Sequence, residues 1–222
     1  SNVAYGLIMY ELERGDSGLR SFASVQNALV MYPIQSYGSD SQRKLYLPAL
    51  ASGDIVGCFG LTEQEGGSDP KAIKTTAIKD GDSYILNGVK RWVTNGDIAD
   101  IAIIWARDDQ GDILGFVVPK EVSGLTVKPI EQKMSLRVSS SSELLLRDVR
   151  VPVTHILPSA CGLFAPLACL TQARYGILWG VLGALEAVYL ESLEFAKTRS
   201  TFGRPIAYRQ LVQSKLVQML SD

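Results

Sequence analysis

The chain has 222 residues, of which 46% are hydrophobic and 20% are charged. These proportions are typical of a folded globular protein of one or two domains and exclude extensive disorder. Lysine and arginine total 22 against 23 for aspartate and glutamate, so no long-range positive field would attract nucleic acid or an anionic membrane. An anionic ligand must therefore be held by local groups.

The cysteines and the single histidine limit the possible chemistry. Cys58, Cys161 and Cys169 form no C-x-x-C pair, and their odd number argues against a disulfide framework and for a reducing compartment. His155 follows a Val-Pro-Val-Thr stretch that we interpret as a surface linker. A single histidine cannot form a histidine-rich metal site, and its linker position does not suit a Ser-His-Asp triad. No metal site is therefore predicted.

The hydrophobic stretches do not predict a membrane protein. Arg174 and Glu186 interrupt the most apolar stretch, so no run of eighteen uncharged apolar residues exists. The first residues lack the basic and then apolar pattern of a signal peptide. We predict no membrane insertion.

Residues 1–55 have apolar side chains at helical spacing and are predicted to be the end of a helical domain. Within them, Ser39 or Ser41 is expected to cap a short helix that Pro48 ends. Residues 56–152 have a β pattern with turns every eight to twelve residues, as in a small sandwich or barrel. They show no β-α-β alternation, which disfavours a Rossmann fold. Predicted hairpins pair 75–78 with 83–86 and 101–106 with 113–118, followed by strands at 125–130 and 142–146.

Residues 153–222 return to a helical pattern, first from about Phe164 to Thr198 and then from Pro205 or Ile206 to the last residue. Gly176, Gly180 and Gly183 recur on the first helix. Each costs about 1 kcal/mol relative to alanine, which indicates close approach of another helix, although tolerated glycines are the alternative. We predict the first helices of a truncated C-terminal bundle and an α+β fold class.

Two polar segments of the β region could hold a planar ligand. Gly57 to Glu63 leads into the loop Gly66-Gly67-Ser68-Asp69, whose backbone N–H groups and hydroxyls could contact a phosphate or a ring edge. Taken alone, such a loop is more often a surface turn. The second segment is Asn87 to Asn95. Its Trp92 and Thr94 are two residues apart and hence on one face of a strand, where they could hold a flat group. The alternative is that Trp92 is an ordinary core residue.

Together, Leu61-Thr62-Glu63 with Gly67-Ser68-Asp69, and then Trp92-Val93-Thr94-Asn95, resemble the two flavin-binding segments of acyl-CoA dehydrogenases. The resemblance covers essentially the whole chain. It implies a β domain between helical domains with FAD at their junction, and Thr94 near flavin N5. The implied FAD contacts are Phe59, Leu61, Thr62, Gly67, Ser68, Trp92 and Thr94.

The segment 199–206 resembles the part of the family that reaches the FAD of a neighbouring subunit, with Arg199, Phe202 and Gln210 as the implied contacts. An arginine suits the pyrophosphate because its planar donors make bidentate, charge-assisted bonds. A surface turn that happens to carry an arginine is the alternative.

Residues 11–21 resemble the glutaryl-CoA dehydrogenase branch, in which an arginine-serine pair receives the distal carboxylate of the substrate. A substrate carboxylate can offset the cost of burying a guanidinium, whereas an alkyl chain cannot. A structural ion pair of Arg20 with Glu13 or Asp16 is the alternative. The implied substrate contacts are Arg20 and Ser21, Glu13 beside the arginine, Val25, Ser68 and Arg174.

Two departures from the family pattern accompany the resemblance. Gln64 replaces a common proline after Leu-Thr-Glu, and Glu65 adds a charge beside the loop. The catalytic base of the family is a glutamate in a Tyr-Glu-Gly motif, which does not occur before Asp222. We therefore assign no catalytic residue, interpret the chain as a fragment lacking both ends of the family, and expect it to be inactive by itself.

The resemblance implies FAD-dependent oxidation of glutaryl-CoA with decarboxylation to crotonyl-CoA, as in lysine and tryptophan catabolism. The alternatives are a dehydrogenase for short or branched acyl-CoA, a non-catalytic flavin- or acyl-CoA-binding fragment, and an acyl-CoA oxidase. Implied partners are the acyl-CoA, an electron-transfer flavoprotein and further copies in a homotetramer. The compartment would be the bacterial cytoplasm or the mitochondrial matrix.

Overall fold

The computed structural model describes residues 1–160 and 162–221, so Cys161 and Asp222 lie outside the described residues. The chain forms two compact units. The first unit comprises Ser1–Arg20 together with the chain from Gly176 onwards, and the second comprises Ser21–Tyr175. The boundaries predicted near residues 55 and 152 remain predictions.

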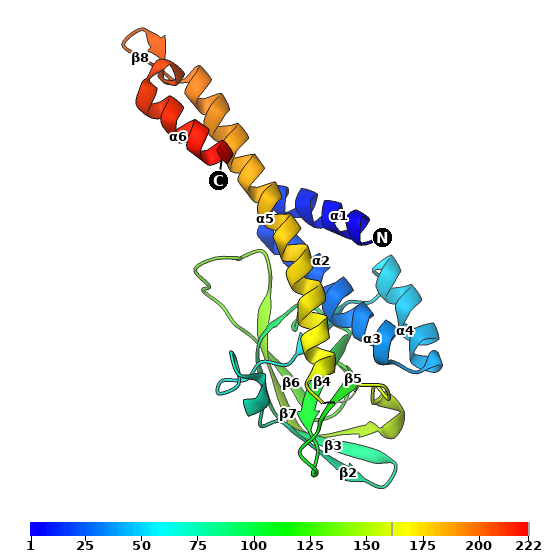
Figure 1. Cartoon of the computed structure of the whole chain (residues 1–222). Coiled ribbons are helices and arrows are strands. Elements are labelled where there is room, and N and C mark those ends of the chain that lie inside the picture. Colours follow the sequence, from blue (N-terminus) through cyan, green and yellow to red (C-terminus); the bar gives the residue numbers. More distant parts are fainter. Residues whose placement is uncertain (161, 222) are drawn as a thin grey trace. The chain divides into compact units, whose positions relative to one another are not determined.

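The first unit is helical apart from one short hairpin (Figure 1). Its long helix lies where the sequence predicted one, with the same first and last residues. The elements are α1 (Asn2–Gly15), the start of α2 (Ser17–Ser24), the second part of α5 (Phe164–Thr198), β8 (Ser200–Thr201), β9 (Arg204–Pro205), a 3₁₀ turn (Ile206–Tyr208) and α6 (Gln210–Ser221).

The glycines of α5 face another helix, as their spacing predicted, and that helix is α1. A methyl group built on Gly183 would lie 2.1 Å from the carbonyl oxygen of Tyr10, and one on Gly180 would lie 2.7 Å from the Glu13 carboxylate. Gly6 of α1 meets Trp179 in the same way, with a distance of 2.4 Å from a built Cβ to the ring. The two helices therefore approach so closely that side chains at these positions would collide.

We expect Gly183→Ala to destabilise the fold by about 1–3 kcal/mol through overpacking against Tyr10, which outweighs the gain of about 1 kcal/mol in helix propensity. Gly15→Ala is the matched control, because nothing lies within 4 Å of a Cβ built there. Urea unfolding of both variants tests this. A Gly183→Ala variant as stable as the unsubstituted protein would contradict the close helix contact.

By length and composition alone, α5 is apolar enough to cross a membrane. A single helix of this kind is weak evidence, because a core helix of a soluble protein meets the same criterion.

The second unit begins with consecutive helical segments. Ser39 caps α4 with a complete capping box involving Gln42, which confirms the predicted start. The predicted end at Pro48 is wrong, since α4 continues to Ser52. Leu50 is buried, and the Gln26 amide donates a hydrogen bond to its carbonyl, so tertiary contacts offset the bond that proline removes. The segments are α2, a π-helix (Val25–Met31), α3 (Tyr32–Tyr37) and α4 (Asp40–Ser52).

Seven strands follow and form one sheet, shaped as a half-barrel, in the order β1-β4-β2-β3-β7-β6, with β5 paired to β4 (Figure 1). Both predicted hairpins are confirmed, as the pairs Ala77↔Leu86 and Ile103↔Val117 show. The strands are β1 (Gly57–Gly60), β2 (Thr76–Asp80), β3 (Ser83–Thr94), β4 (Ile101–Arg107), β5 (Ile113–Pro119), β6 (Leu125–Pro129) and β7 (Ser141–Pro152).

The sheet has a hydrophobic core on each face. Alternate residues of β4 enter opposite cores: Ile103 and Trp105 lie in one, and Ala102 and Ile104 in the other. The first core also contains helical residues such as Val30, whose side chain would meet a Cβ on Gly57 at 2.4 Å. Burial on both faces explains the unbroken apolar sequence of β4.

Candidate functional site

A distortion of β3 begins the candidate site. The pairing of β3 with β7 shifts register between Lys90 and Val93, and Trp92 has a φ of 58°. A bulky residue in the left-handed region costs of order 1–3 kcal/mol, and such strain is concentrated at functional sites. Trp92 is also 56% exposed, so it is not the core tryptophan that the sequence left open as an alternative.

The second unit has a cavity of about 290 Å³ beside this distortion. It collects all seven residues implied as FAD contacts and three implied as substrate contacts. Trp92 and Thr94 share it although the bulge breaks the regular alternation on which their predicted common face rested. The predicted residues in its lining are Val25, Phe59, Leu61, Thr62, Gly67, Ser68, Trp92, Thr94 and Arg174.

Four lining residues were not predicted: Leu29, Pro70, Leu167 and Leu170. Leu167 and Leu170 precede Arg174 by seven and four residues, and Leu29 follows Val25 by four. These are the spacings of one helical face. Three of the four could therefore have been predicted as residues on the same helical face as Val25 or Arg174.

The cavity combines one exposed aromatic plane, the hydroxyl-bearing residues Thr62, Ser68 and Thr94, the cation Arg174 and an apolar wall. A flat heterocycle with a polar edge fits this composition. Because the volume is at the low end of the roughly 300–1,000 Å³ of ligand pockets, it can take the ring end of a dinucleotide and not the whole molecule.

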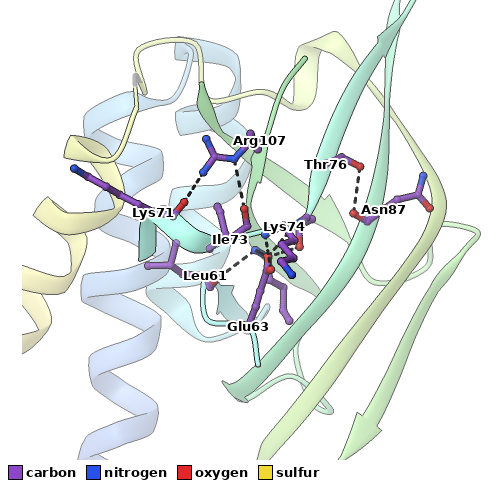
Figure 2. A network of polar contacts seen from close by, with 10 residues as sticks. Leu61, Glu63, Lys71, Ile73, Lys74, Thr76, Asn87 and Arg107 are labelled. Atoms are coloured by element: carbon purple, nitrogen blue, oxygen red, sulfur yellow. Dashed lines mark hydrogen bonds and ion pairs between the residues drawn. The ribbon is translucent and has the colours of Figure 1, made fainter. Parts of the chain in front are cut away.

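A buried ion pair that was not predicted from the sequence lies next to the lining residues Leu61 and Thr62, and Figure 2 shows its carboxylate, Glu63, beside Leu61 and Lys74. The Lys90 ammonium is 2.7 Å from Glu63 Oε1 and donates a second bond of 3.2 Å to the Leu61 carbonyl. Glu63 also accepts from the Lys74 amide at 2.6 Å and from the Thr75 hydroxyl at 2.5 Å. The Lys90 side chain is completely buried and that of Glu63 is 8% exposed.

The segment that follows the glycine loop is held by a further side chain. Arg107 of β4 donates to the carbonyl of Lys71 at 2.5 Å and to that of Ile73 at 3.4 Å (Figure 2). Both carbonyls follow the Gly67-Ser68 part of the cavity lining in sequence. The loop is therefore fixed from β3 on one side and from β4 on the other.

Burial lowers the pKa of Lys90 to about 8, and the attraction of Glu63 only partly opposes this. The pKa of Glu63 is also lowered, because Lys90 and the bonds from Thr75 and Lys74 outweigh the opposing effect of burial. The carboxylate is therefore the firmly charged member of the pair, and Lys90 is the member that loses its charge more easily than in water as the pH rises.

The free energy of unfolding should contain a component that rises with pH between about 8 and 10.5. In that window the unfolded chain keeps a proton at Lys90, whose ordinary pKa is 10.5, and the folded chain has released it. Urea unfolding of the cofactor-free protein and of Lys90→Met across this window tests the expectation. The stability difference between the two should grow with pH in favour of the unsubstituted protein, and a constant or shrinking difference would contradict it.

The residues implied as carboxylate contacts lie in or next to the first unit. Arg20 Nε donates to Glu13, and the two side chains are only 11% and 8% exposed. Asp16 instead accepts from the amide of Gly18 at 2.6 Å. Of the two ion-pair partners considered for Arg20, the structure thus has Glu13. Ser21 follows Arg20 directly and is partly buried.

The residues implied as contacts to a neighbouring subunit lie in the hairpin region of the first unit. Phe202 is 97% exposed at the hairpin tip with a φ of 52°, and the Arg209 guanidinium lies 5.7 Å from its ring. Arg199 immediately precedes β8, and Gln210 begins α6. None of Arg199, Phe202 and Gln210 lines the 290 Å³ cavity.

A second cavity of the second unit, about 600 Å³, lies where β7 begins, beside the end of β3. Its lining is rich in hydroxyl groups, from the serines at 139–141, and carries two cations, Lys133 and Arg137, beside two carboxylates, Asp97 and Glu131. Ser141 pairs with Thr94 of the first cavity across β3 and β7. This region was not predicted from the sequence, because lysine, arginine and serine in a loop carry no distinctive spacing.

Three family models match successive parts of the chain. They are "Acyl-CoA dehydrogenase, N-terminal domain" at residues 1–54, "Acyl-CoA dehydrogenase, middle domain" at 58–149 and "Acyl-CoA dehydrogenase, C-terminal domain" at 161–222.

Curated relatives agree with this match. An acyl-CoA dehydrogenase of Bacillus subtilis is 39% identical over 98% of this chain and 59% of its own length. The mitochondrial short-chain specific acyl-CoA dehydrogenase of Homo sapiens is 36% identical over 98% of this chain and 54% of its own length. The chain thus spans little more than half the length of these relatives.

Solved structures extend the comparison. A glutaryl-CoA dehydrogenase from Mycobacterium smegmatis is 52% identical with a TM-score of 0.96, covering 99% of this chain and 56% of that chain. A second such structure, in complex with FADH2, is 48% identical with a TM-score of 0.98, covering 100% and 57%. The butyryl-CoA dehydrogenase of Megasphaera elsdenii is 32% identical with a TM-score of 0.94, covering 100% and 59%.

Proposed function

Because this chain belongs to the acyl-CoA dehydrogenase family, we propose that the natural protein carrying it oxidises glutaryl-CoA with FAD and releases carbon dioxide to give crotonyl-CoA. The observation that carries the choice of substrate is the buried Arg20, whose side chain is 11% exposed and bonded to Glu13. A buried cation is costly unless anions surround it, and a substrate carboxylate supplies one. Two solved structures that are about half identical to this chain are glutaryl-CoA dehydrogenases, which supports the same choice.

The cofactor is FAD, and the residues of the 290 Å³ cavity fit its ring. Trp92 offers an exposed aromatic face and Thr62, Ser68 and Thr94 offer hydroxyl groups, as a planar ring with a polar edge requires. When bound, the flavin supplies the redox chemistry by accepting a hydride from the substrate. Arg199, Phe202 and Gln210 are proposed to contact the FAD of a neighbouring subunit.

The residues of this chain would bind the flavin ring and the acyl-CoA and hold them in position. Trp92 and the apolar wall would exclude water from one side of the ring, and the Thr94 hydroxyl would donate to its polar edge. Val25, Ser68 and Arg174 would contact the acyl group, and Arg20 and Ser21 its distal carboxylate. Lys133 and Arg137 of the 600 Å³ cavity suit the phosphates of coenzyme A.

A dehydrogenase for a short or branched monocarboxylic acyl-CoA is the second candidate, supported by the 36% identity to the short-chain specific enzyme. In that case Arg20 and Glu13 form a structural ion pair. The same proposal includes an electron-transfer flavoprotein as the electron acceptor and a homotetrameric assembly. It places the protein in the bacterial cytoplasm or the mitochondrial matrix. The Tyr-Glu-Gly motif with the family base is not in these 222 residues, so we propose that this stretch alone does not turn over substrate.

An anaerobic titration of the natural protein tests the proposal by following the flavin absorbance with glutaryl-CoA and, separately, with butyryl-CoA. We expect preferential bleaching by glutaryl-CoA and crotonyl-CoA as product. Preferential bleaching by butyryl-CoA would support an acyl-CoA dehydrogenase but contradict the proposed carboxylate-binding role of Arg20 and Ser21. Hydrogen peroxide formed on admission of oxygen, at the rate of turnover, would indicate an oxidase.

A further inference from the structure

Two of the segments that line the ring site are joined to each other by a few hydrogen bonds. The loop Leu61–Glu63 and the strand β3 each contribute two residues to the cavity, Leu61 and Thr62 from the loop and Trp92 and Thr94 from the strand. The Arg91 amide donates to the Thr62 carbonyl at 2.8 Å. The two bonds of the Lys90 ammonium, to Leu61 and to Glu63, complete the connection.

Lys90 does not line the cavity, although its neighbour two positions along does. Its side chain is fully buried and directed to the back of the loop, where a Cβ on Gly60 would lie 3.1 Å from its Cγ. It therefore cannot contact a ligand in the cavity. Any influence of Lys90 on a bound ring passes through the loop carbonyls and the distorted segment Lys90–Val93.

Stability alone does not explain the pair. Replacing a buried ion pair by apolar side chains of similar volume is often neutral or stabilising, whereas removing one partner is strongly destabilising. Lys90 and Glu63 meet where β3 leaves its register with β7, and Glu63 is held by the Thr75 hydroxyl and two backbone amides besides the lysine. A buried polar network satisfied in this way specifies one geometry.

We propose that Lys90 and Glu63 are positioning residues that set the distance and register between the Leu61–Thr62 edge and the Trp92–Thr94 edge of the flavin site. This rests on the proposed FAD site and adds to it the device that holds its two halves together. The pair acts on the cofactor only through Leu61, Thr62 and the bulge, and it is not catalytic.

The test compares FAD affinity with the stability of the cofactor-free natural protein. We expect Lys90→Met to lower the melting temperature, because it leaves Glu63 as an unpaired buried charge, and to weaken FAD binding by about tenfold or more. The double variant Lys90→Met/Glu63→Gln removes both charges and should recover the melting temperature. It should still bind FAD about tenfold more weakly, with shifted flavin absorption bands, because the two halves are no longer tied.

Lys74→Met is the matched control. Lys74 pairs with Glu65 of the same loop, but its side chain is 71% exposed, so its loss should change neither affinity nor spectrum. Thr75→Val, which removes one of the bonds to Glu63 and keeps both charges, should give a smaller loss of affinity than the double variant.

Double-variant protein that recovers stability and binds FAD with unchanged affinity and spectrum would overturn the positioning role while leaving the FAD site intact. Unchanged FAD binding by Thr75→Val, found together with unchanged binding by the double variant, would also contradict the positioning role. Failure of the unsubstituted protein to bind FAD would overturn the proposed function itself, and the two failures are thus distinguishable.

Discussion

Arg20→Gln should lower kcat/KM for glutaryl-CoA by roughly 30-fold to several thousand-fold, because truncating one member of a buried, hydrogen-bonded charge pair costs about 2–5 kcal/mol and each 1.4 kcal/mol is a factor of ten. The loss should be specific to the dicarboxylic substrate. Butyryl-CoA has no distal carboxylate, so its kcat/KM should change little. Steady-state kinetics with both substrates is the measurement.

Two further variants separate recognition from structure. Arg14→Gln is the matched control, because Arg14 lies on α1, six positions before Arg20, but is 41% exposed and pairs with Glu11 at 3.7 Å. It should leave both substrates unaffected. The double variant Glu13→Gln/Arg20→Gln relieves the unpaired Glu13 and should recover stability without recovering glutaryl-CoA turnover. Equal losses on both substrates from Arg20→Gln would make the Arg20–Glu13 pair structural.

Trp92→Gly should weaken FAD binding by about 10- to 150-fold without lowering the stability of the cofactor-free protein. Burying one large aromatic side chain against a ligand contributes about 1.5–3 kcal/mol, which the variant loses. Glycine adopts a φ of 58° without strain, and Trp92 is 56% exposed, so the fold loses little packing. Flavin fluorescence titration and thermal unfolding measure the two effects.

Asp148→Gly provides the control for backbone strain. Asp148 has a φ of 51° on the neighbouring strand β7 and does not line the cavity, so relief of its strain should leave FAD affinity unchanged. Trp92→Phe keeps an aromatic face and should lose less affinity than Trp92→Gly. A Trp92→Gly variant that loses stability and keeps its affinity would place Trp92 in the packing of the fold instead of the flavin site.

The order of the elements was predictable because it depends on local patterns. The 3.6-residue period fixed α5 at both ends, since no proline after Pro166 interrupts it. The period of two and the turn residues located both hairpins. Prediction failed at Pro48, where the buried Leu50 and its hydrogen bond to Gln26 keep the helix intact. A local rule cannot weigh a contact with a residue more than twenty positions away.

The candidate site was predictable as a set of residues, through the resemblance of two short segments to a family. Their meeting in one cavity depends on the pairing of β3 with the loop after β1, and only the tertiary structure decides that. The left-handed Trp92 follows from the bulge between β3 and β7, which the sequence does not mark.

The sequence by itself determined the helical and β segments and the close approach of another helix to the glycines of α5, because these follow from residue types at fixed spacings. The family followed from the resemblance of short motifs. That the approaching helix is α1 was decided by the tertiary structure. Only the tertiary structure decided that Glu63 and Lys90, 27 positions apart, are bonded to each other in the interior. In sequence both are ordinary charged residues of a polar segment. Their pairing follows from burial, since a charge removed from water must find its partner nearby, wherever in the chain that partner lies.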